Sequence, residues 1–393
     1  MKEIVIASVA RTPIGKLLGS FKNVPAIELG VAASKEALRR AKVKEEEIEE
    51  VIIGCTHQEG LRPNPARQIA IKAGIPKEVP SMTINKLCGS GLKAMEIASL
   101  AIKAGDADII MAGGIENMTR VPFLLLEGRT GSKLNDMRLR DALFYDGFQD
   151  PFINDLMGMT AENVAEKFNV TREQQDEFAF SSHRKAVKAI KEGKFAGEIV
   201  PVEVPQRKAN PVVVDTDECP RQDTSLEKLA KLPTVFKKGG TVTAGNTCAI
   251  SDAGSAAVIM SKEKAQEKGI KPMGMFLSFA AVGVDPAIMG FAPAPAIRKA
   301  VGKAGLTLND IELVELNEAF ASQSIAVIRD LGLDPEIFNV NGGAIALGHP
   351  VGATGTRLVA SLIYEMKRRN LSLGVASMCI GGGQGIAAVI RID

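Results

Sequence analysis

Two kinds of apolar spacing alternate along the first part of the chain. Short runs rich in β-branched residues, at positions 4–9, 51–55 and 107–112, are typical of buried strands. Between them, residues 25–41 and 92–103 carry apolar side chains at helical spacing. Strands that alternate with helices favour an α/β domain with a buried, mainly parallel sheet.

The pattern changes between residues 119 and 245. Residues 122–147 are polar and rich in turn formers, with little periodicity. Beyond them the spacing predicts helices over 160–168 and 171–192, and the second opens on a Thr-x-x-Gln capping box. We interpret this block as an insertion between two α/β parts.

The carboxy-terminal part repeats the first. Residues 296–314 follow the pattern of residues 33–51 at a shift of 263 positions, counted from Ile48 to Ile311. The glycine-rich segment around His349 matches the one around Cys88 at a shift of 261. Two nearly equal shifts indicate internal duplication. A pseudo-twofold between the halves would place His349 opposite Cys88.

Composition excludes several classes of partner. The 393 residues carry 48 basic and 46 acidic side chains, a net charge of +2, and no Trp, so nothing marks a nucleic acid or a membrane surface as the ligand. The five cysteines are odd in number and form no C-x-x-C pair, which predicts reduced thiols in a cytoplasmic protein without a metal site. No apolar run approaches the ~18 residues of a membrane span.

Cys88 is the most informative single residue. It lies between a predicted strand and a predicted helix and is followed by Gly89 and Gly91, which allow close approach by a ligand. A helix that begins just after the sulfur would favour the thiolate. Taken alone, Cys88 fits a small buried hydrophobic residue equally well.

Three other residues change that balance. His349 also precedes a helix, whose positive end favours a neutral imidazole that can act as a base. Cys379 ends a predicted strand before three glycines, whose bare N–H groups suit an oxyanion hole. Asn317 follows an apolar strand at the sheet edge where α/β sites lie, although it would also serve as a helix cap.

Seven motifs then identify a family. In chain order they are NKLCGSG at 85–91, GGIENM at 113–118, MGMTAEN at 157–163, GVDP at 283–286, NEAFA at 317–321, GGAIALGHP at 342–350 and CIGGGQG at 379–385. Together the chain resembles a thiolase, an acyl-CoA:acetyl-CoA C-acyltransferase, over its whole length. The resemblance implies duplicated α/β/α halves in five layers with mixed sheets, divided as 1–118 plus about 246–270, an inserted loop domain at 119–245, and 271–393.

The resemblance also assigns roles in a Claisen condensation. Cys88 would take the acyl group as a thioester, and His349 would activate it. Cys379 would remove the α-proton of acetyl-CoA or return it in thiolysis. Asn317 would hold a water that forms one oxyanion hole with His349, and the N–H groups of Cys88 and Gly381 would form the other.

The coenzyme A contacts follow by the same resemblance. Arg221 would lie near the adenine nucleotide. The apolar contacts to the pantetheine or acyl group would be Met157, Phe236, Ala244, Met289, Ala319 and Phe320. Two positions depart from the usual pattern: Leu156 stands where many acetoacetyl-specific members have His, and Cys248 stands where the family usually has Ser.

These residues predict acetyl transfer between acetyl-CoA, acetoacetyl-CoA and free coenzyme A, with no separate cofactor. Two alternatives stay open. One is a broader 3-oxoacyl-CoA thiolase of fatty acid β-oxidation, and the other is a non-catalytic subunit that binds acyl-CoA or scaffolds a partner enzyme. The resemblance also implies a homodimer or homotetramer, with residues 123–141 as the tetramer contact.

Overall fold

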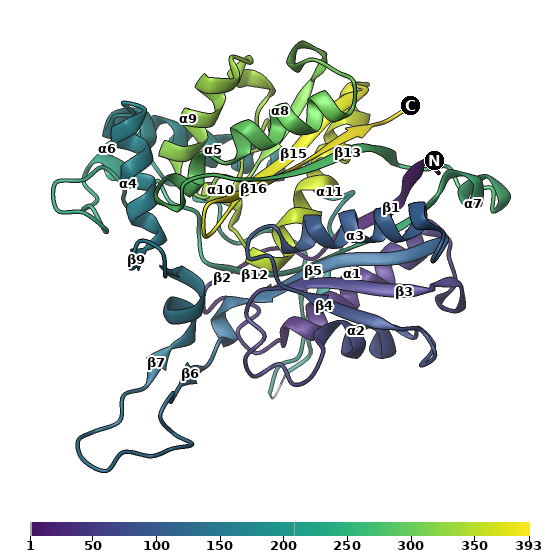
Figure 1. Cartoon of the computed structure of the whole chain (residues 1–393), viewed down its shortest axis with the longest axis horizontal. Coiled ribbons are helices and arrows are strands. Elements are labelled where there is room, and N and C mark those ends of the chain that lie inside the picture. Colours follow the sequence, from purple (N-terminus) through teal and green to yellow (C-terminus); the bar gives the residue numbers. More distant parts are fainter. Residues whose placement is uncertain (1, 208) are drawn as a thin grey trace.

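The computed structural model describes residues 2–207 and 209–393, so Met1 and Lys208, which fall in predicted segments, lie outside the described residues. Its main sheet has the strand order β14-β15-β16-β13-β1-β12-β5-β3-β4, and β2 pairs with β12 (Figure 1). The strands are β1 Ile4–Arg11, β2 Gly15–Lys16, β3 Glu50–Cys55, β4 Ser81–Ile84, β5 Ile109–Asn117, β12 Ser251–Ser261, β13 Gly274–Gly283, β14 Leu313–Leu316, β15 Leu373–Ile380 and β16 Gln384–Arg391.

The sheet is mixed, and the expectation of a mainly parallel sheet is wrong. Only β3 with β4, β3 with β5, and β14 with β15 pair in parallel. The long strands β1, β12, β13 and β16 pair antiparallel with their neighbours. Helices cover both faces of these strands, and burial on both faces produces continuous apolar runs whatever the strand direction.

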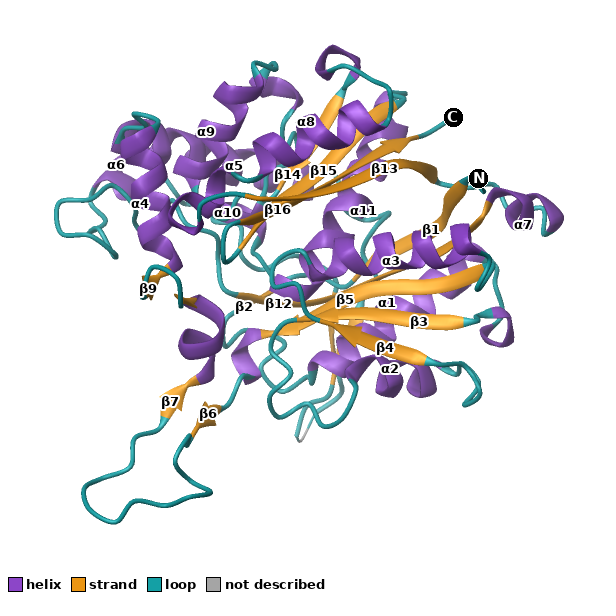
Figure 2. Ribbon diagram, in the orientation of Figure 1, coloured by secondary structure: helices purple, strands orange, loops and turns teal. Residues whose placement is uncertain are grey.

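Helices arrange the sheet into five layers (Figure 2). The inner layer is formed by α3 (Ser90–Ala104) and α11 (Val351–Arg369), which share one apolar core with both halves of the sheet. The outer face of the first half packs on α1 (Ala26–Ala41) and α2 (Pro65–Ala73). The outer face of the second half packs on α8 (Pro293–Lys303) and α9 (Ala321–Leu331).

The duplication extends to single hydrogen bonds. In the first half, the Glu49 carboxylate accepts from the backbone N–H groups of Asp108 and Ile109 at 3.1 and 3.2 Å. In the second half, Glu312 accepts from Ser372 and Leu373 at 2.7 and 2.8 Å. Glu49 and Glu312 are 263 positions apart, the shift derived from the apolar pattern. The two halves therefore start their third strands with the same side-chain contact.

The segment between β5 and β12 lies outside the main sheet. Its helices are α4 (Met157–Lys167), α5 (Arg172–Lys191) and α6 (Leu226–Ala230), with a π-helix at Leu143–Phe148. Three short hairpins join them: β6 Phe123–Leu124 with β7 Arg140–Asp141, β8 Gln149–Asp150 with β9 Asp155–Leu156, and β10 Val202–Val204 with β11 Val212–Val214. The loop between β6 and β7 forms an arm that projects from the body (Figure 1).

The remaining short elements lie in connections. They are α7 (Lys262–Glu267), α10 (Ala344–Leu347) and the 3-10 turns Glu45–Glu47, Met118–Arg120, Pro286–Phe291, Leu308–Asp310 and Pro335–Ile337.

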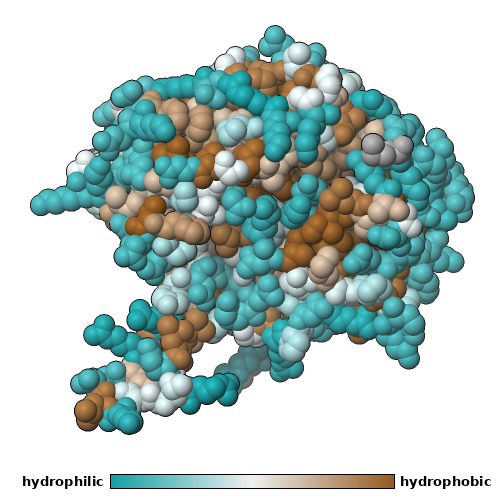
Figure 3. Space-filling view, in the orientation of Figure 1, coloured by the Kyte–Doolittle hydropathy of each residue, from teal (hydrophilic) through white to brown (hydrophobic). Residues whose placement is uncertain are grey.

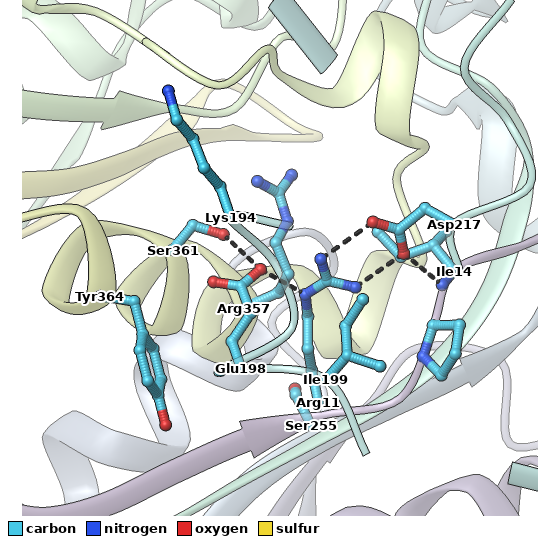
Figure 4. Close-up of polar contacts among 12 residues, drawn as sticks. Arg11, Ile14, Lys194, Glu198, Ile199, Asp217, Ser255, Arg357, Ser361 and Tyr364 are labelled. Carbon is cyan, nitrogen blue, oxygen red and sulfur yellow. Dashed lines mark hydrogen bonds and ion pairs between the residues drawn. The ribbon is translucent and has the colours of Figure 1, made fainter. Parts of the chain in front are cut away.

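A buried ion network ties the inserted segment to the main sheet (Figure 4). Arg11 of β1 donates to Glu198 at 2.7 Å and to both oxygens of Asp217 at 2.7 and 2.9 Å. All three side chains are almost fully buried. Arg357 of α11 lies beside this group, with its Nη1 3.6 Å from a Glu315 oxygen. Because buried charges are costly unless paired, Arg11 fixes where the segment around residues 198 and 217 crosses the core.

Candidate functional site

Cys88 lies in the turn that joins β4 to α3. Leu87 has a positive φ of 46°, and the Ser90 hydroxyl donates to the Leu87 carbonyl at 2.7 Å while accepting from the Lys86 N–H at 2.8 Å. A Cβ on Gly89 would meet the Ile380 side chain at 2.5 Å, so this turn packs directly against the end of β15. These contacts hold the sulfur between the first turn of α3 and the strand that carries Cys379.

His349 lies just before α11 and has its imidazole fixed. Its Nδ1 is 2.7 Å from the Thr354 hydroxyl, which itself donates to the Pro350 carbonyl at 2.9 Å. Since a hydroxyl has one proton to give, we assign the proton of the imidazole to Nδ1. Burial lowers the pKa of His349 to about 3, with a smaller contribution from Arg357. The imidazole is therefore neutral, as the sequence predicted, with a free lone pair on Nε2.

Asn317 brings a side-chain amide to that lone pair. It follows β14, where its backbone N–H donates to the Ser377 carbonyl at 2.9 Å, and its Nδ2 is 3.4 Å from His349 Nε2. The buried Oδ1 of Asn317 has no hydrogen-bond partner among the described residues. A buried acceptor of this kind is suited to a water or a substrate group.

The N–H groups of Cys88 and Gly381 converge on the Cys88 sulfur, which is the arrangement expected for an oxyanion hole. Burial nevertheless raises the pKa of the Cys88 thiol to about 11, against the lowering effect of these two donors. The expectation that the helix start favours a thiolate is therefore wrong for the substrate-free site, because burial outweighs the dipole. Cys88 starts as a thiol.

Cys379 and Cys248 are close enough to Cys88 for their charges to interact. Burial raises the pKa of Cys379 well above its ordinary value, and the charges of Cys88 and Cys248 add to that rise. Burial likewise raises the pKa of Cys248 to about 12, with Cys88 as the largest charge contribution. The structure thus gathers three protonated thiols from three separate segments.

Apolar residues surround Cys379, and most of the predicted acyl contacts are among them. The cluster comprises Ala161, Val242, Met289, Ala319 and Phe320 with Cys379, and Met157 and Phe236 pack against it. A Cβ on Gly381 would lie 2.4 Å from the Met157 methyl group, so Met157 also touches the oxyanion side of the site. The backbone N–H of Cys248 donates to the Ala319 carbonyl at 3.0 Å.

The other predicted coenzyme A residues lie farther out. Leu156 is half-buried at the start of α4, and Ala244 is exposed in a turn. Arg221 is exposed, and its backbone N–H donates to His183 Nδ1 at 3.1 Å. Arg221 lines a surface depression of about 570 Å³ that also contains Arg184, Lys188 and Lys191. This depression is basic.

Sequence reasoning missed several residues of the site. Thr354 orients His349 from one turn into α11, and its position five residues after His349 was the available signal. Glu116 lies inside the GGIENM motif but received no role. Ala161 and Val242 line the apolar cluster, and only the fold brings them there, because small apolar residues carry no chemical signal.

Two searches of residues 2–207 and 209–393 returned nothing. No group of three His, Cys, Asp or Glu side chains there could hold a metal ion. No helix there is long and apolar enough to cross a membrane.

Comparisons with known proteins agree with this site. The chain matches the model of the thiolase N-terminal domain over residues 4–263 and that of the thiolase C-terminal domain over residues 270–392. It is 52% identical to an acetyl-CoA acetyltransferase of Syntrophomonas wolfei over 99% of both chains. Two solved structures superpose closely: a Bacillus anthracis acetyl-CoA acetyltransferase (TM-score 0.98, 44% identity, 100% of this chain and 99% of the other) and human mitochondrial 3-ketoacyl-CoA thiolase (TM-score 0.96, 41% identity, 99% and 98%). The chain therefore belongs to the thiolase family of acyltransferases.

Proposed function

We propose that this thiolase exchanges acetyl groups between short CoA thioesters through a thioester on Cys88. The observation that carries the proposal is the convergence of the Cys88 and Gly381 N–H groups on the sulfur, beside an imidazole whose free nitrogen faces the site. Those two N–H groups would bind the carbonyl oxygen of the acyl group as it becomes an oxyanion.

In the first half-reaction, the Cys88 thiol attacks the thioester carbonyl of acetyl-CoA and passes its proton to His349 Nε2. The carbon–sulfur bond to CoA then breaks, and the CoA thiolate takes the proton from His349. Because Cys88 starts as a thiol and His349 as a neutral base, proton transfer accompanies attack in this scheme. The products are acetyl-Cys88 and free CoA.

In the second half-reaction, another acetyl-CoA binds and Cys379 removes its α-proton. A charged Cys379 is costly in its apolar surroundings, so the proton is removed as the enolate forms and its oxygen is held by a water on Asn317 and by His349. The carbanion attacks acetyl-Cys88, the thioester to Cys88 breaks, and the Cys379 proton returns to the leaving Cys88 sulfur. Acetoacetyl-CoA is released, and thiolysis is the reverse sequence.

We infer a short-chain preference from the crowding around Cys379, where Met289 and Phe320 are buried and Phe236 packs edge-on to Phe320 at a centroid distance of 6.4 Å. The broader alternative rests on the likeness to the human 3-ketoacyl-CoA thiolase. The test is the thiolysis rate with free CoA for 3-oxoacyl-CoAs of increasing length. A rate confined to acetoacetyl-CoA supports the short-chain reading, and rates that hold or rise with length refute it.

The substrates would be held from the outside inward. Arg221 would pair with the phosphates of CoA, Leu156 and Ala244 would lie along the pantetheine, and Cys248 would offer a weaker hydrogen bond than the usual serine. No separate cofactor enters these steps, since coenzyme A arrives and leaves as substrate. We keep the division at 1–118 plus about 246–270, 119–245 and 271–393 as a proposal, together with a cytoplasmic location and a role in fatty acid metabolism.

Two apolar surfaces support a homo-oligomer. The arm between β6 and β7 exposes Phe123 (62%), Leu134 (82%), Met137 and Leu139, and a second apolar group lies over α3, where Leu100 is 54% exposed (Figure 3). The second group adjoins β4, an edge strand of the sheet. Exposed apolar patches and free strand edges favour association with another chain. We propose that copies pair through α3 and β4, and that the arm joins dimers into a tetramer.

A further inference from the structure

Glu116 makes contacts that the proposed chemistry has not used. It is the last residue but one of β5, and its side chain is almost fully buried. One carboxylate oxygen accepts from the Gly352 N–H at 2.9 Å and from the Thr56 N–H at 3.2 Å, and the other accepts from the His57 N–H at 3.0 Å. A single carboxylate thus joins three backbone groups from two distant segments.

One of these segments supports Cys88. Thr56 follows β3, and its hydroxyl donates to the Leu87 carbonyl at 3.3 Å, while its own carbonyl accepts from the Asn85 amide at 3.1 Å. The turn that carries Cys88 is therefore held by the residue that Glu116 holds.

The other segment carries His349. Gly352 lies in the first turn of α11, three residues after His349, so its N–H is one of the groups that a helix start leaves without an intrahelical partner. A negative charge at this end of the helix is favourable. Burial raises the pKa of Glu116, whereas the charge on His57 and the three N–H groups lower it.

The surrounding backbone leaves little room for adjustment. A Cβ on Gly114 would lie 1.9 Å from the Gly352 carbonyl oxygen, and one on Gly352 would lie 2.4 Å from the Ile115 carbonyl oxygen. The end of β5 and the start of α11 therefore pack backbone to backbone, and Glu116 is the ionisable group at this junction that contacts both.

We propose that Glu116 is a positioning residue that sets the His349 imidazole relative to the Cys88 sulfur. This inference rests on the proposed roles of Cys88 and His349, but it does not require Glu116 to touch the substrate. Loss of the carboxylate frees the first turn of α11 from the Cys88 turn, and a small displacement between a nucleophile and its base slows the reaction without weakening substrate binding.

The test compares Glu116→Ala and Glu116→Gln with a control, Glu49→Gln. Glu49 accepts from two backbone N–H groups at the opposite end of β5, away from the site, and is more exposed. For each protein we would measure Tm, kcat and KM for CoA in thiolysis, and the single-turnover rate of acetyl-Cys88 formation by intact mass. Glutamine can keep the oxygen shared by Thr56 and Gly352 but opposes the His57 N–H with a second donor.

We expect kcat and the acetylation rate to fall together by ~10²-fold for Glu116→Ala, with KM changing by less than about threefold. Glu116→Gln should fall between, at roughly tenfold, and it carries the test if the alanine variant does not fold. Glu49→Gln should keep its kcat. A folded Glu116 variant that acetylates Cys88 at the wild-type rate overturns the inference. Failure of the wild-type protein to acetylate Cys88 would instead overturn the proposed function.

Discussion

Gly355→Ala should slow catalysis by moving the two helices that carry Cys88 and His349 apart. Gly355 lies in the second turn of α11, where this helix crosses the first turn of α3. A Cβ at this position would lie 2.2 Å from the Leu92 backbone N and 2.9 Å from its Cα, whereas ordinary contacts begin at 3.4 Å. Because the atoms in the way belong to backbone, the helices must separate by about 1.2 Å.

The magnitude follows from that separation. Alanine gains about 1 kcal/mol of helix propensity over glycine, while overpacking costs ~1–3 kcal/mol, so the free energy of unfolding falls by about 2 kcal/mol at most. A shift of ~1 Å between catalytic groups can cost ~10²-fold in rate. The folded variant should therefore lose far more kcat than stability.

The assay is thiolysis of acetoacetyl-CoA at saturating CoA, with Tm measured on the same samples. Gly302→Ala is the matched control, because Gly302 is also inside a helix but a Cβ there would meet nothing within 4 Å. The control should gain up to about 1 kcal/mol and keep its kcat. A Gly355→Ala enzyme with wild-type kcat and a raised Tm would refute the argument that this crossing sets the site.

Three further results are expected. Cys379→Ala should still form acetyl-Cys88 but lose condensation, and unchanged condensation would remove Cys379 from its role. In the substrate-free enzyme, alkylation of Cys88 by iodoacetamide, followed by peptide mass mapping, should keep rising above pH 10, since burial raises the pKa of its thiol to about 11 and only the thiolate reacts; a plateau below pH 8 would contradict this. Arg11→Leu should cost ~3–5 kcal/mol in urea unfolding, because it leaves Glu198 and Asp217 buried without a partner, and a loss below ~1 kcal/mol would show that these carboxylates are not charged in the folded state.

Much of the architecture could be predicted because duplication leaves a repeated pattern. The shifts of 263 and 261 between the halves predicted that His349 and Cys88 lie on matching elements, and the structure places both at the starts of the two central helices, α11 and α3. Strand direction could not be predicted in the same way. Apolar runs report burial on both faces, and β12 and β16 are buried in that sense although they run antiparallel to their neighbours.

The candidate site was predictable where a residue carries its own chemistry. Cys88, His349, Asn317 and Cys379 stood out, whereas Glu116 acts on backbone groups that are distant in sequence, so no spacing could indicate its partners. The protonation of Cys88 was also beyond the sequence. The helix start that favours a thiolate is visible in the motif, but the burial that outweighs it depends on packing from β15 and the inserted segment.

The central claim is that acyl transfer passes through Cys88. The most direct test is to incubate the enzyme with acetyl-CoA, quench in acid, and measure intact mass followed by peptide mapping. The account predicts one added acetyl group on the peptide that contains Cys88, lost again when free CoA is added before the quench. An acetyl group on another residue, or active enzyme that never carries one, would contradict it.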